Sequence, residues 1–437
     1  MERRGFVQQL AAGACGAALP GLLRPNGLDA IRRAASRLTG TPAESAADEE
    51  FWREVQQAFS INRSMLNLDN GNVCPSPRIV TEAMVRYTWE QQDSPAYMVH
   101  EVLERQGGGL MEGLAALAGT SPDELAITRN ATEALHNVLL GVPLKAGDEV
   151  LTTAHDYWGM LDALEQRRDR DGITVTMIPV PVPATSLDQL AAAFERAMTP
   201  KTRLILVSHA VNLTGQLFPV KQLCEIAHRR GIQVVVDGAQ TFALLDYKIP
   251  DLGCDYFGTS LHKWLLAPIG TGLLYVRRDH IASTWPLMPA PARARGGMFK
   301  FWNLGTFSPA PLLAISEAIA FHNGIGGARK EARLRYLTRY WTDKARDIPG
   351  IRFLASFAPE MSCGLATFQL GDIDHDALRQ YLLERYSIVV QSMGTRRDPS
   401  IKGLRVTPNV YTTLDELDRF VAILHDVGKN GIPKRPA

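Results

Sequence analysis

The sequence predicts an α/β fold, with a large domain built on a mostly parallel mixed sheet and a smaller α+β domain after it. Two observations support this prediction. Short apolar, β-branched runs alternate with helical patterns through the middle of the chain, and this texture changes near residue 309. Strands separated by helices indicate βαβ units, which build parallel sheets. The 437 residues, 46% of them hydrophobic, are enough for two domains.

The large domain is expected at residues 51–308, which carry the alternating pattern. Its strands are expected at the apolar runs, 149–152, 174–178, 203–208, 232–237 and 272–276. Helical patterns lie between many of these runs, at 133–140, 160–168, 187–198 and 220–230. Parallel neighbours need such crossover helices, so this order predicts a sheet flanked by helices.

The smaller domain is expected at residues 309–437, where the alternation stops. A helix at 312–322 and a charged helix at 328–345 lead into it. Strands are expected near 363–370, 387–390 and 403–407, followed by a last helix at 414–426. This grouping of strands and helices is typical of an α+β domain.

The N-terminus, residues 1–35, is expected to be a twin-arginine (Tat) export signal. Residues 3–7 read Arg-Arg-Gly-Phe-Val, and a weakly apolar run rich in Ala and Gly follows, which resembles such a signal. Export would make the protein periplasmic. The alternative is an amphipathic leader helix that stays in the cytoplasm. Residues 36–50 are polar and are expected to be a linker.

Composition argues against several classes of function. The net charge is +1 and no basic run is interleaved with aromatic residues, which disfavours nucleic-acid binding. No stretch reaches the roughly 18 apolar residues of a membrane-spanning helix, so no stable membrane insertion is expected. The later cysteines match no zinc pattern and no dense disulfide framework, so no metal site is expected. We expect these four to be core thiols: Cys74, Cys224, Cys254 and Cys363.

Lys263 fits its neighbourhood badly, because the apolar residues Trp264, Leu265 and Leu266 follow it directly. Lysine is rarely buried, since removing an ammonium group from water is expensive. A ligand bound beside the core would explain its position. In a doubly wound sheet, ligands bind beyond the carboxyl ends of the strands, so residues after the expected strands are the candidates.

Polar groups do follow several of these strands. Asp237 comes directly after three valines, and a lone buried carboxylate is costly without a partner. Residues 130–132, Asn-Ala-Thr, open a helix and offer backbone N–H groups and a hydroxyl to an anion. Other candidates after strand ends are Asn212, His155, Tyr157 and Trp158.

Pyridoxal 5'-phosphate (PLP) would account for these groups together. It needs a lysine for a Schiff base and a carboxylate against its pyridine nitrogen. It also needs donors for its phosphate and an aromatic or imidazole group over its ring. Asp237 would keep the pyridine nitrogen protonated, and Lys263 would become a nucleophilic amine.

The chain resembles the class V aminotransferase family of fold type I PLP enzymes, and most of all its isopenicillin N epimerase-like branch. The resemblance runs from LNLDNGNVCPSPRIV at 66–80 to LRVTPNVYTTLDELDRF at 404–420. The motifs ATE, DGAQ and SLHK occur in the family's order, which aligns Thr132, Asp237 and Lys263. The resemblance implies the PLP-dependent transferase fold of type I.

The resemblance also implies roles around the cofactor ring. Lys263 matches the Schiff-base lysine, and Asp237 matches the partner of the pyridinium. Gln240 matches the residue near the phenolic oxygen, with Asn212 in the same area. One of two residues is expected to stack on the ring, and the sequence does not choose between them: His155 or Tyr157.

At the phosphate, the resemblance implies contacts from the SLHK motif and a helix start: Ser260, His262, Ala131 and Thr132. Gly305 and Thr306 match an element that reaches the phosphate of a partner subunit, which implies a homodimer with shared active sites. Arg405 matches the arginine that clamps the substrate α-carboxylate, where a bidentate geometry is useful. The structural alternatives are an ion pair for Arg405, a turn for Thr306 and satisfied loop histidines for His155 and His262.

The cofactor limits the substrate to a small-molecule amine, most often an amino acid. Isopenicillin N epimerase-like chemistry at the α-carbon is the expected function, with the freed lysine amine as base. Alternatives are a class V aminotransferase, an exported enzyme that modifies a siderophore or peptide, and a non-catalytic PLP-binding protein. Residues 391–405 contain no cysteine where cysteine desulfurases carry their nucleophile, which disfavours that reaction.

Overall fold

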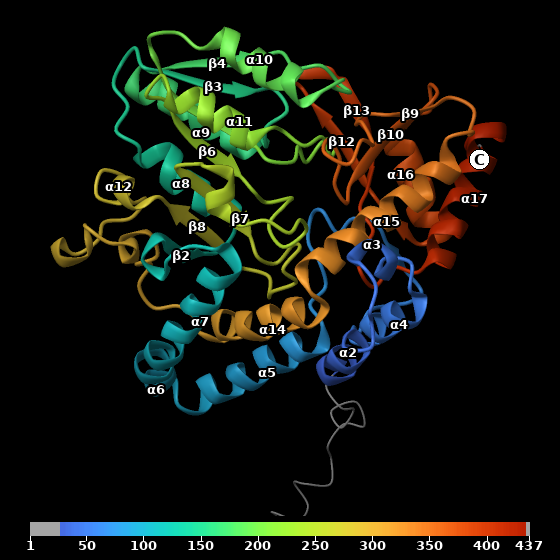
Figure 1. Cartoon of the computed structure of the whole chain (residues 1–437), viewed down its shortest axis with the longest axis horizontal. Coiled ribbons are helices and arrows are strands. Elements are labelled where there is room, and N and C mark those ends of the chain that lie inside the picture. The colour runs from blue at the N-terminus through green and yellow to red at the C-terminus, as the bar shows by residue number, and fades with distance from the viewer. Residues whose placement is uncertain (1–26, 434–437) are drawn as a thin grey trace, which may run out of the picture.

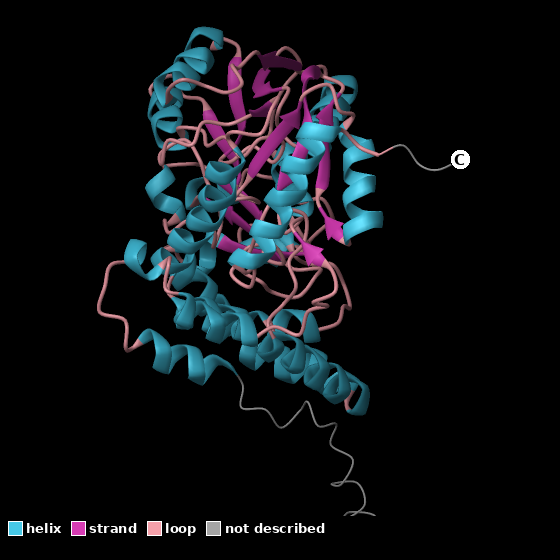
Figure 2. Ribbon diagram, turned by 90° about the vertical axis from the view of Figure 1, so that its right-hand side faces the viewer, coloured by secondary structure: helices cyan, strands magenta, loops and turns pink. Residues whose placement is uncertain are grey.

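The computed structural model describes residues 27–433. Most of the predicted export signal, residues 1–26, lies outside the described residues. Figure 1 shows a large domain, mainly green and yellow, beside a small domain in orange and red, with blue N-terminal helices below. Figure 2 shows helices on both sides of the strands.

A seven-stranded sheet forms the centre of the large domain, in the order β2-β8-β7-β6-β5-β3-β4. Its strands are β2 (Leu125–Thr128), β3 (Glu149–Thr153), β4 (Thr174–Ile178), β5 (Thr202–Ser208), β6 (Gln233–Asp237), β7 (Tyr256–Ser260) and β8 (Gly272–Val276). β8 is antiparallel to β2 and β7, and the other neighbours are parallel. The prediction of a mostly parallel mixed sheet is therefore confirmed.

Strands β2 and β7 were not among the predicted strands. β7 ends in Gly-Thr-Ser and looks polar, yet all five of its residues are buried. A Cβ at Gly258 would lie 2.6 Å from Cγ of Leu135, so glycine lets helix α8 (Ala131–Gly141) pack closely on this strand.

Helices cover both faces of this sheet. They are α5 (Arg78–Asp93), α6 (Pro95–Tyr97), α7 (Leu103–Ala118), α8 (Ala131–Gly141), α9 (Trp158–Asp171), α10 (Leu187–Ala197), α11 (Val220–His228), α12 (Arg278–Ile281), α13 (Ala310–Leu313) and α14 (Ile315–Ile325). Short turns are η1 (Met98–Val102), η2 (Pro122–Glu124), η3 (Ile249–Leu252), η4 (Ala292–Ala294) and η5 (Met298–Phe301). Val234 and Val236 of β6 face one apolar cluster and Val235 faces another, which explains the unbroken apolar run of this central strand.

The small domain has a four-stranded antiparallel sheet in the order β12-β13-β10-β9. Its elements are β9 (Ile351–Phe353), β10 (Ala366–Leu370), β12 (Gln391–Thr395), β13 (Asp398–Val406), α15 (Gly327–Ala345), α16 (His375–Tyr386) and α17 (Leu414–Asn430). A parallel pair, β1 (Leu66–Asn67) and β11 (Ile388–Val389), attaches the earlier part of the chain to this domain.

Helices α13 and α14, which follow the predicted domain boundary at 309, lie against helices of the large domain. α13 and α14 both pack on α5 and α7. The small-domain cluster takes its first α15 residue at Leu337. The sequence of an apolar helix does not reveal which domain the helix covers.

The predicted linker at 36–50 is folded onto the protein. The N-terminal helices are α2 (Gly27–Ala35), α3 (Pro42–Ser45) and α4 (Glu49–Gln57). Thr41 and Glu44 form a capping box for α3. Arg333 of α15 is buried, donates to the Ala46 carbonyl oxygen at 2.9 Å and pairs with Glu49. The segment is polar because it supplies these caps and contacts, and it is not an extended linker.

Three observations on residues 27–433 bear on function. Cys74, Cys224, Cys254 and Cys363 are buried and unpaired, which confirms the prediction of core thiols. In this part of the chain no helix is long and apolar enough to cross a bilayer. The same residues contain no cluster of His, Cys, Asp and Glu suited to a metal ion.

Candidate active site

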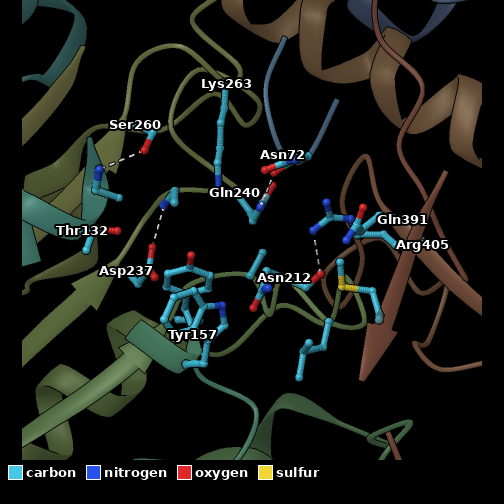
Figure 3. Close-up of a pocket in the computed structure, with 18 of the residues that line it drawn as sticks. Asn72, Thr132, Tyr157, Asn212, Asp237, Gln240, Ser260, Lys263, Gln391 and Arg405 are labelled. Carbon is cyan, nitrogen blue, oxygen red and sulfur yellow. Dashed lines mark hydrogen bonds between the residues drawn. The ribbon is translucent and has the colours of Figure 1, made fainter. Parts of the chain in front are cut away.

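A cavity of about 410 Å³ lies at the carboxyl ends of the large-sheet strands, against the small domain (Figure 3). Arg405 and most of the predicted cofactor residues line it: Ala131, Thr132, Tyr157, Asn212, Asp237, Gln240, Ser260, His262 and Lys263. Of the remaining predictions, His155, Gly305 and Thr306 do not line this cavity.

Strand register brings these residues together. Ser208 at the end of β5 pairs with Asp237 of β6, and Asp237 pairs with Gly258 of β7. Ser260, the last residue of β7, pairs with Gly272 of β8. Because the parallel strands end at one edge of the sheet, side chains from distant parts of the sequence meet there.

Lys263 follows β7, and Figure 3 shows its side chain reaching into the middle of the cavity. Within residues 27–433 its amine has no hydrogen bond and no ion pair. Burial lowers the pKa of Lys263 to about 8; the Asp237 carboxylate opposes this shift and Arg405 adds to it. An amine with this pKa is partly neutral at pH 7 and can act as a nucleophile.

The backbone beside Lys263 is anchored by a second buried lysine. Lys330 of α15 donates its Nζ to the carbonyl oxygen of Trp264. The Trp264 indole donates to Gln240 Oε1 at 3.1 Å, and Gln240 Nε2 donates to the Gly71 carbonyl oxygen at 2.8 Å. These contacts hold the Lys263 turn and keep Gln240 at the edge of the cavity.

Asp237 lies across the cavity from Lys263 (Figure 3). Its Oδ1 accepts a hydrogen bond from the Ala239 backbone N–H at 2.9 Å. Burial raises the pKa of Asp237 to about 6, while the Ala239 N–H and Lys263 oppose the shift. A Cβ at Gly238 would lie 1.8 Å from the Phe257 ring, which explains the glycine of DGAQ.

Asp156, which was not among the predicted site residues, fixes the neighbouring strand ends. Its Oδ2 accepts from Thr152 Oγ1 and from the backbone N–H and hydroxyl of Thr153, each at 2.9 Å. Its Oδ1 accepts from the backbone N–H and hydroxyl of Ser208, each at 2.7 Å. This carboxylate therefore ties β3 to β5 and positions Tyr157.

The structure separates the two candidates for ring stacking. Tyr157 lines the cavity on the side of Asp237. His155 is buried elsewhere, with Nε2 3.0 Å from Oδ2 of Asp398 at the start of β13. The imidazole of His155 thus turns to a carboxylate of the small domain, whereas Tyr157 borders the cavity.

A second contact set holds the same hairpin of β12 and β13. Arg397 donates to Asp162 Oδ1 at 2.9 Å and to Glu165 Oε1 at 2.8 Å, both on α9. We call these contacts, together with the His155–Asp398 pair, the hairpin clamp. It joins the small domain to the large one beside the cavity.

The start of α8 forms a site suited to an anion. The side chain of Asn130 caps the helix, and the Ala131 N–H donates to Ser260 Oγ at 2.9 Å. The Thr132 hydroxyl has no hydrogen-bond partner among the described residues. A Cβ at Gly272 would lie 2.7 Å from the Asn130 backbone, so glycine allows this close approach. The helix N-terminus adds partial positive charge.

His262 lies at the same end of the cavity. Its Nδ1 is 3.1 Å from the Thr271 carbonyl oxygen, which can only accept, so Nδ1 carries the hydrogen and Nε2 remains for a ligand. Burial, and then Lys263, lowers the pKa of His262. A bound anion would oppose that shift.

Arg405 lines the opposite wall and is held by an ion pair. Its Nη2 is 2.8 Å from Asp69 Oδ1, and its Nη1 donates to the Asn212 carbonyl oxygen at 3.1 Å. Burial lowers the pKa of Arg405, and Asp69 opposes the shift. The structural alternative considered for Arg405 is therefore present, and the guanidinium also faces the cavity (Figure 3).

Sequence reasoning missed several lining residues, among them Asn72 and four residues of β12: Gln391, Ser392, Met393 and Gly394. Their only sequence signal is position, because Gln391 directly follows a predicted strand. Gly305 and Thr306 are exposed in the loop before α13. Their predicted role concerns a partner subunit and stays a prediction.

None of the cysteines in residues 27–433 lines the cavity. Burial raises the pKa of Cys74 to about 12 and that of Cys363 to about 11. Both are therefore neutral thiols at physiological pH, and a thiol is a poor nucleophile compared with a thiolate.

Comparisons with known proteins agree with this geometry. Residues 66–420 match the family described as Aminotransferase class-V. The isopenicillin N epimerase of Streptomyces clavuligerus is 32% identical over 85% of this chain and 97% of its own length. That of Amycolatopsis lactamdurans is also 32% identical, over 86% and 99%. A probable cysteine desulfurase of Halalkalibacterium halodurans is 27% identical over 84% and 95%.

Solved structures share the fold. A C-DES variant with glycine covalently linked to its PLP cofactor has a TM-score of 0.75 at 23% identity, covering 83% of this chain and 97% of that one. A cysteine desulfurase from Escherichia coli has a TM-score of 0.75 at 19% identity, covering 91% and 100%. The family match, the two epimerase relatives and the arrangement around Lys263 lead to one conclusion: this chain belongs to the class V aminotransferase family of PLP-dependent enzymes.

Proposed function

We propose that this enzyme binds PLP covalently through Lys263 and acts at the α-carbon of an amino acid or an amino-acid-containing metabolite. One observation carries the proposal. The Lys263 amine has no protein partner in the described residues and faces the buried Asp237 carboxylate across a cavity.

The residues present fit this cofactor. Burial raises the pKa of the Asp237 carboxyl to about 6, and a pyridinium beside it would stabilise the charged carboxylate. The Thr132 hydroxyl, the α8 N-terminus and His262 Nε2 are available to a phosphate. Tyr157 borders the space between the two ends, where the cofactor ring would lie.

The residues divide the work of the reaction. When bound, PLP supplies an electron sink for charge that develops at the substrate α-carbon. Asp237 holds a proton on the cofactor nitrogen. The Lys263 Nζ would take the α-proton, and its lowered pKa suits this role near neutral pH. Arg405 orients the substrate carboxylate.

We favour isopenicillin N epimerase-like chemistry for this site. The two epimerases are 32% identical to this chain, whereas the desulfurase is 27% identical. No cysteine of the described chain lines the cavity, which argues against desulfuration. A class V aminotransferase, or an exported enzyme that modifies a siderophore or peptide, is the alternative, since both would use the same lysine and aspartate. A PLP-binding protein without catalysis is the least favoured reading.

Cofactor binding is tested by adding PLP to the purified protein and recording its visible absorbance. We expect a protein-bound band that Lys263→Ala abolishes. Lys221→Ala, which removes an exposed lysine of α11, should keep the band. An unchanged band in Lys263→Ala would refute the covalent role of this residue.

The reaction is tested by incubating the loaded enzyme with L- and D-amino acids and candidate peptides in heavy water. α-Deuteration with inversion is the result expected of an epimerase. Formation of a keto acid with an added acceptor would identify an aminotransferase instead. If no candidate gives either deuteration with inversion or a keto acid, the result would argue for a non-catalytic role.

We also propose a homodimer in which Gly305 and Thr306 reach the neighbouring active site, and export to the periplasm through the predicted Tat signal. The exposure of these two residues in one chain is compatible with the first proposal. A fully active monomer would contradict the dimer. The export proposal would be contradicted if the wild-type protein stays in the cytoplasm and if replacing Arg3 and Arg4 with lysine does not change its location.

A further inference from the structure

The charges around the cavity are few. Among the described residues, its ionised side chains are those of Asp237, Lys263 and Arg405. In the function proposed above, the first two serve the cofactor. Arg405 then remains as the one cation for the substrate, which matches a single carboxylate.

The group beside Arg405 is a neutral amide. Gln391 of β12 pairs in register with Arg405 of β13, so the two side chains share one face of the hairpin. Figure 3 shows them next to each other at the small-domain wall. The Gln391 amide has no hydrogen-bond partner among residues 27–433.

Asn72 presents a second free amide at the same cavity. It lies on the side of Lys263 and Gln240 in Figure 3, and within the described chain its side chain makes no hydrogen bond. An amide offers both donors and an acceptor, so a pair of amides suits a neutral group that also both donates and accepts. A carboxylate only accepts, and without a second cation its charge would be left unpaired.

Besides these polar groups, the cavity has an apolar part. Trp158, Met160 and Met393 line the cavity without charge. The Trp158 side chain is largely exposed at the start of α9, and its ring centroid lies 5.1 Å from that of Tyr157. These groups can cover the methylene part of a side chain.

We propose that the enzyme selects an amino-acid unit with one free carboxylate and an uncharged side chain that ends in a hydrogen-bonding group of the carboxamide type. Gln391 is the residue that sets this preference. The Gln391 amide would hydrogen-bond the neutral end of the substrate side chain. Because glutamine carries no charge, a second substrate carboxylate would find no cation at this position. The inference rests on the proposed function, since it assigns Lys263 and Asp237 to the cofactor.

L-Glutamine and L-glutamate provide a matched pair of probes, because they have nearly the same shape and differ in charge. The PLP-loaded full chain is titrated with each, and binding is read from the change in the absorbance of the bound cofactor. We expect half-saturation with glutamine at a concentration about tenfold lower than with glutamate. L-Methionine, which is neutral but lacks the amide, should fall between them.

Two variants of Gln391 sharpen the test. Gln391→Lys adds a cation beside Arg405 and should reverse the preference in favour of glutamate. Gln391→Met keeps the length without charge or amide, so it should weaken glutamine binding about fivefold and leave glutamate within twofold. Gln391 is the first residue of β12, and an unchanged cofactor band in each variant shows that the site is intact.

Equal half-saturation for glutamine and glutamate would overturn this inference while leaving the proposed function in place. So would a Gln391→Lys variant whose preference stays that of the wild type. An absorbance band that no amino acid changes would instead overturn the proposed amino-acid substrate, and the inference with it.

Discussion

The two walls of the cavity are prepared in opposite ways. On the large-domain wall, the Lys263 amine and the Thr132 hydroxyl have no protein partner among the described residues, and Asp237 is only partly compensated. On the small-domain wall, Arg405 is already held by Asp69 and by the Asn212 backbone. One wall therefore leaves its polar groups for a ligand, and the other fixes its cation in advance.

This difference indicates which ligand each wall serves. Unpaired groups such as Lys263 are costly unless a resident ligand satisfies them, which favours a cofactor that stays bound. A preoriented arginine such as Arg405 loses little side-chain entropy when a substrate arrives and leaves. We call the large-domain wall the first wall and the small-domain wall the second wall. Substitutions on the first wall should affect chemistry, and those on the second wall should affect substrate binding.

The largest effect is expected at Asp237. Asp237→Asn keeps the shape but removes the charge that would hold the cofactor nitrogen protonated. We expect kcat/KM to fall by about a hundredfold or more, while the visible band persists because Lys263 is intact. A kcat/KM within threefold of the wild type would show that the first wall does not control the chemistry.

Arg405→Lys tests the second wall. A lysine ammonium cannot contact Asp69, the Asn212 carbonyl and a substrate carboxylate in the fork geometry of a guanidinium. We expect KM to rise by about 10- to 100-fold with kcat within about threefold, at an unchanged cofactor band. Arg352→Lys, at an exposed arginine of β9, is the control and should leave both constants unchanged. A fall in kcat alone would place Arg405 with the chemistry.

The first wall was far easier to predict from the sequence than the second. Asp237 and Lys263 stand in short motifs, DGAQ and SLHK, whose chemistry is recognisable. Gln391 carries no such signature, because its place beside Arg405 depends on hairpin register. The sequence could not choose between His155 and Tyr157, because the two lie close together before α9. The contact of His155 with Asp398, 243 residues away, distinguishes them in the structure.

The pH dependence of cofactor attachment tests the state of Lys263. Only the neutral amine attacks an aldehyde, so a pKa lowered to about 8 makes the rate rise with pH and level off above that value. Between pH 7 and pH 9 the neutral fraction, and with it the rate of band formation, should increase roughly tenfold. A lysine peptide run in parallel should show no plateau below pH 10. A plateau missing from the protein as well would mean that burial does not lower this pKa.

The hairpin clamp should give the smallest effect. His155→Ala removes the contact with Asp398 but leaves the contacts of Arg397 with α9, so the hairpin stays attached at one point. We expect KM to rise about threefold with the cofactor band unchanged, and His155→Ala with Asp398→Ala together should cost no more than either alone. His100→Ala, at an exposed histidine, is the control. Loss of the band in His155→Ala would return His155 to the cofactor.

The covalent role of Lys263 can be read directly by mass spectrometry. The protein is saturated with PLP, reduced with borohydride so that the bond to the amine becomes permanent, and digested. We predict that the peptide containing Lys263 carries the reduced cofactor and that the peptide containing Lys330, another buried lysine with a lowered pKa, does not. Cofactor found on Lys330 or on a surface lysine, with Lys263 unmodified, would contradict the account.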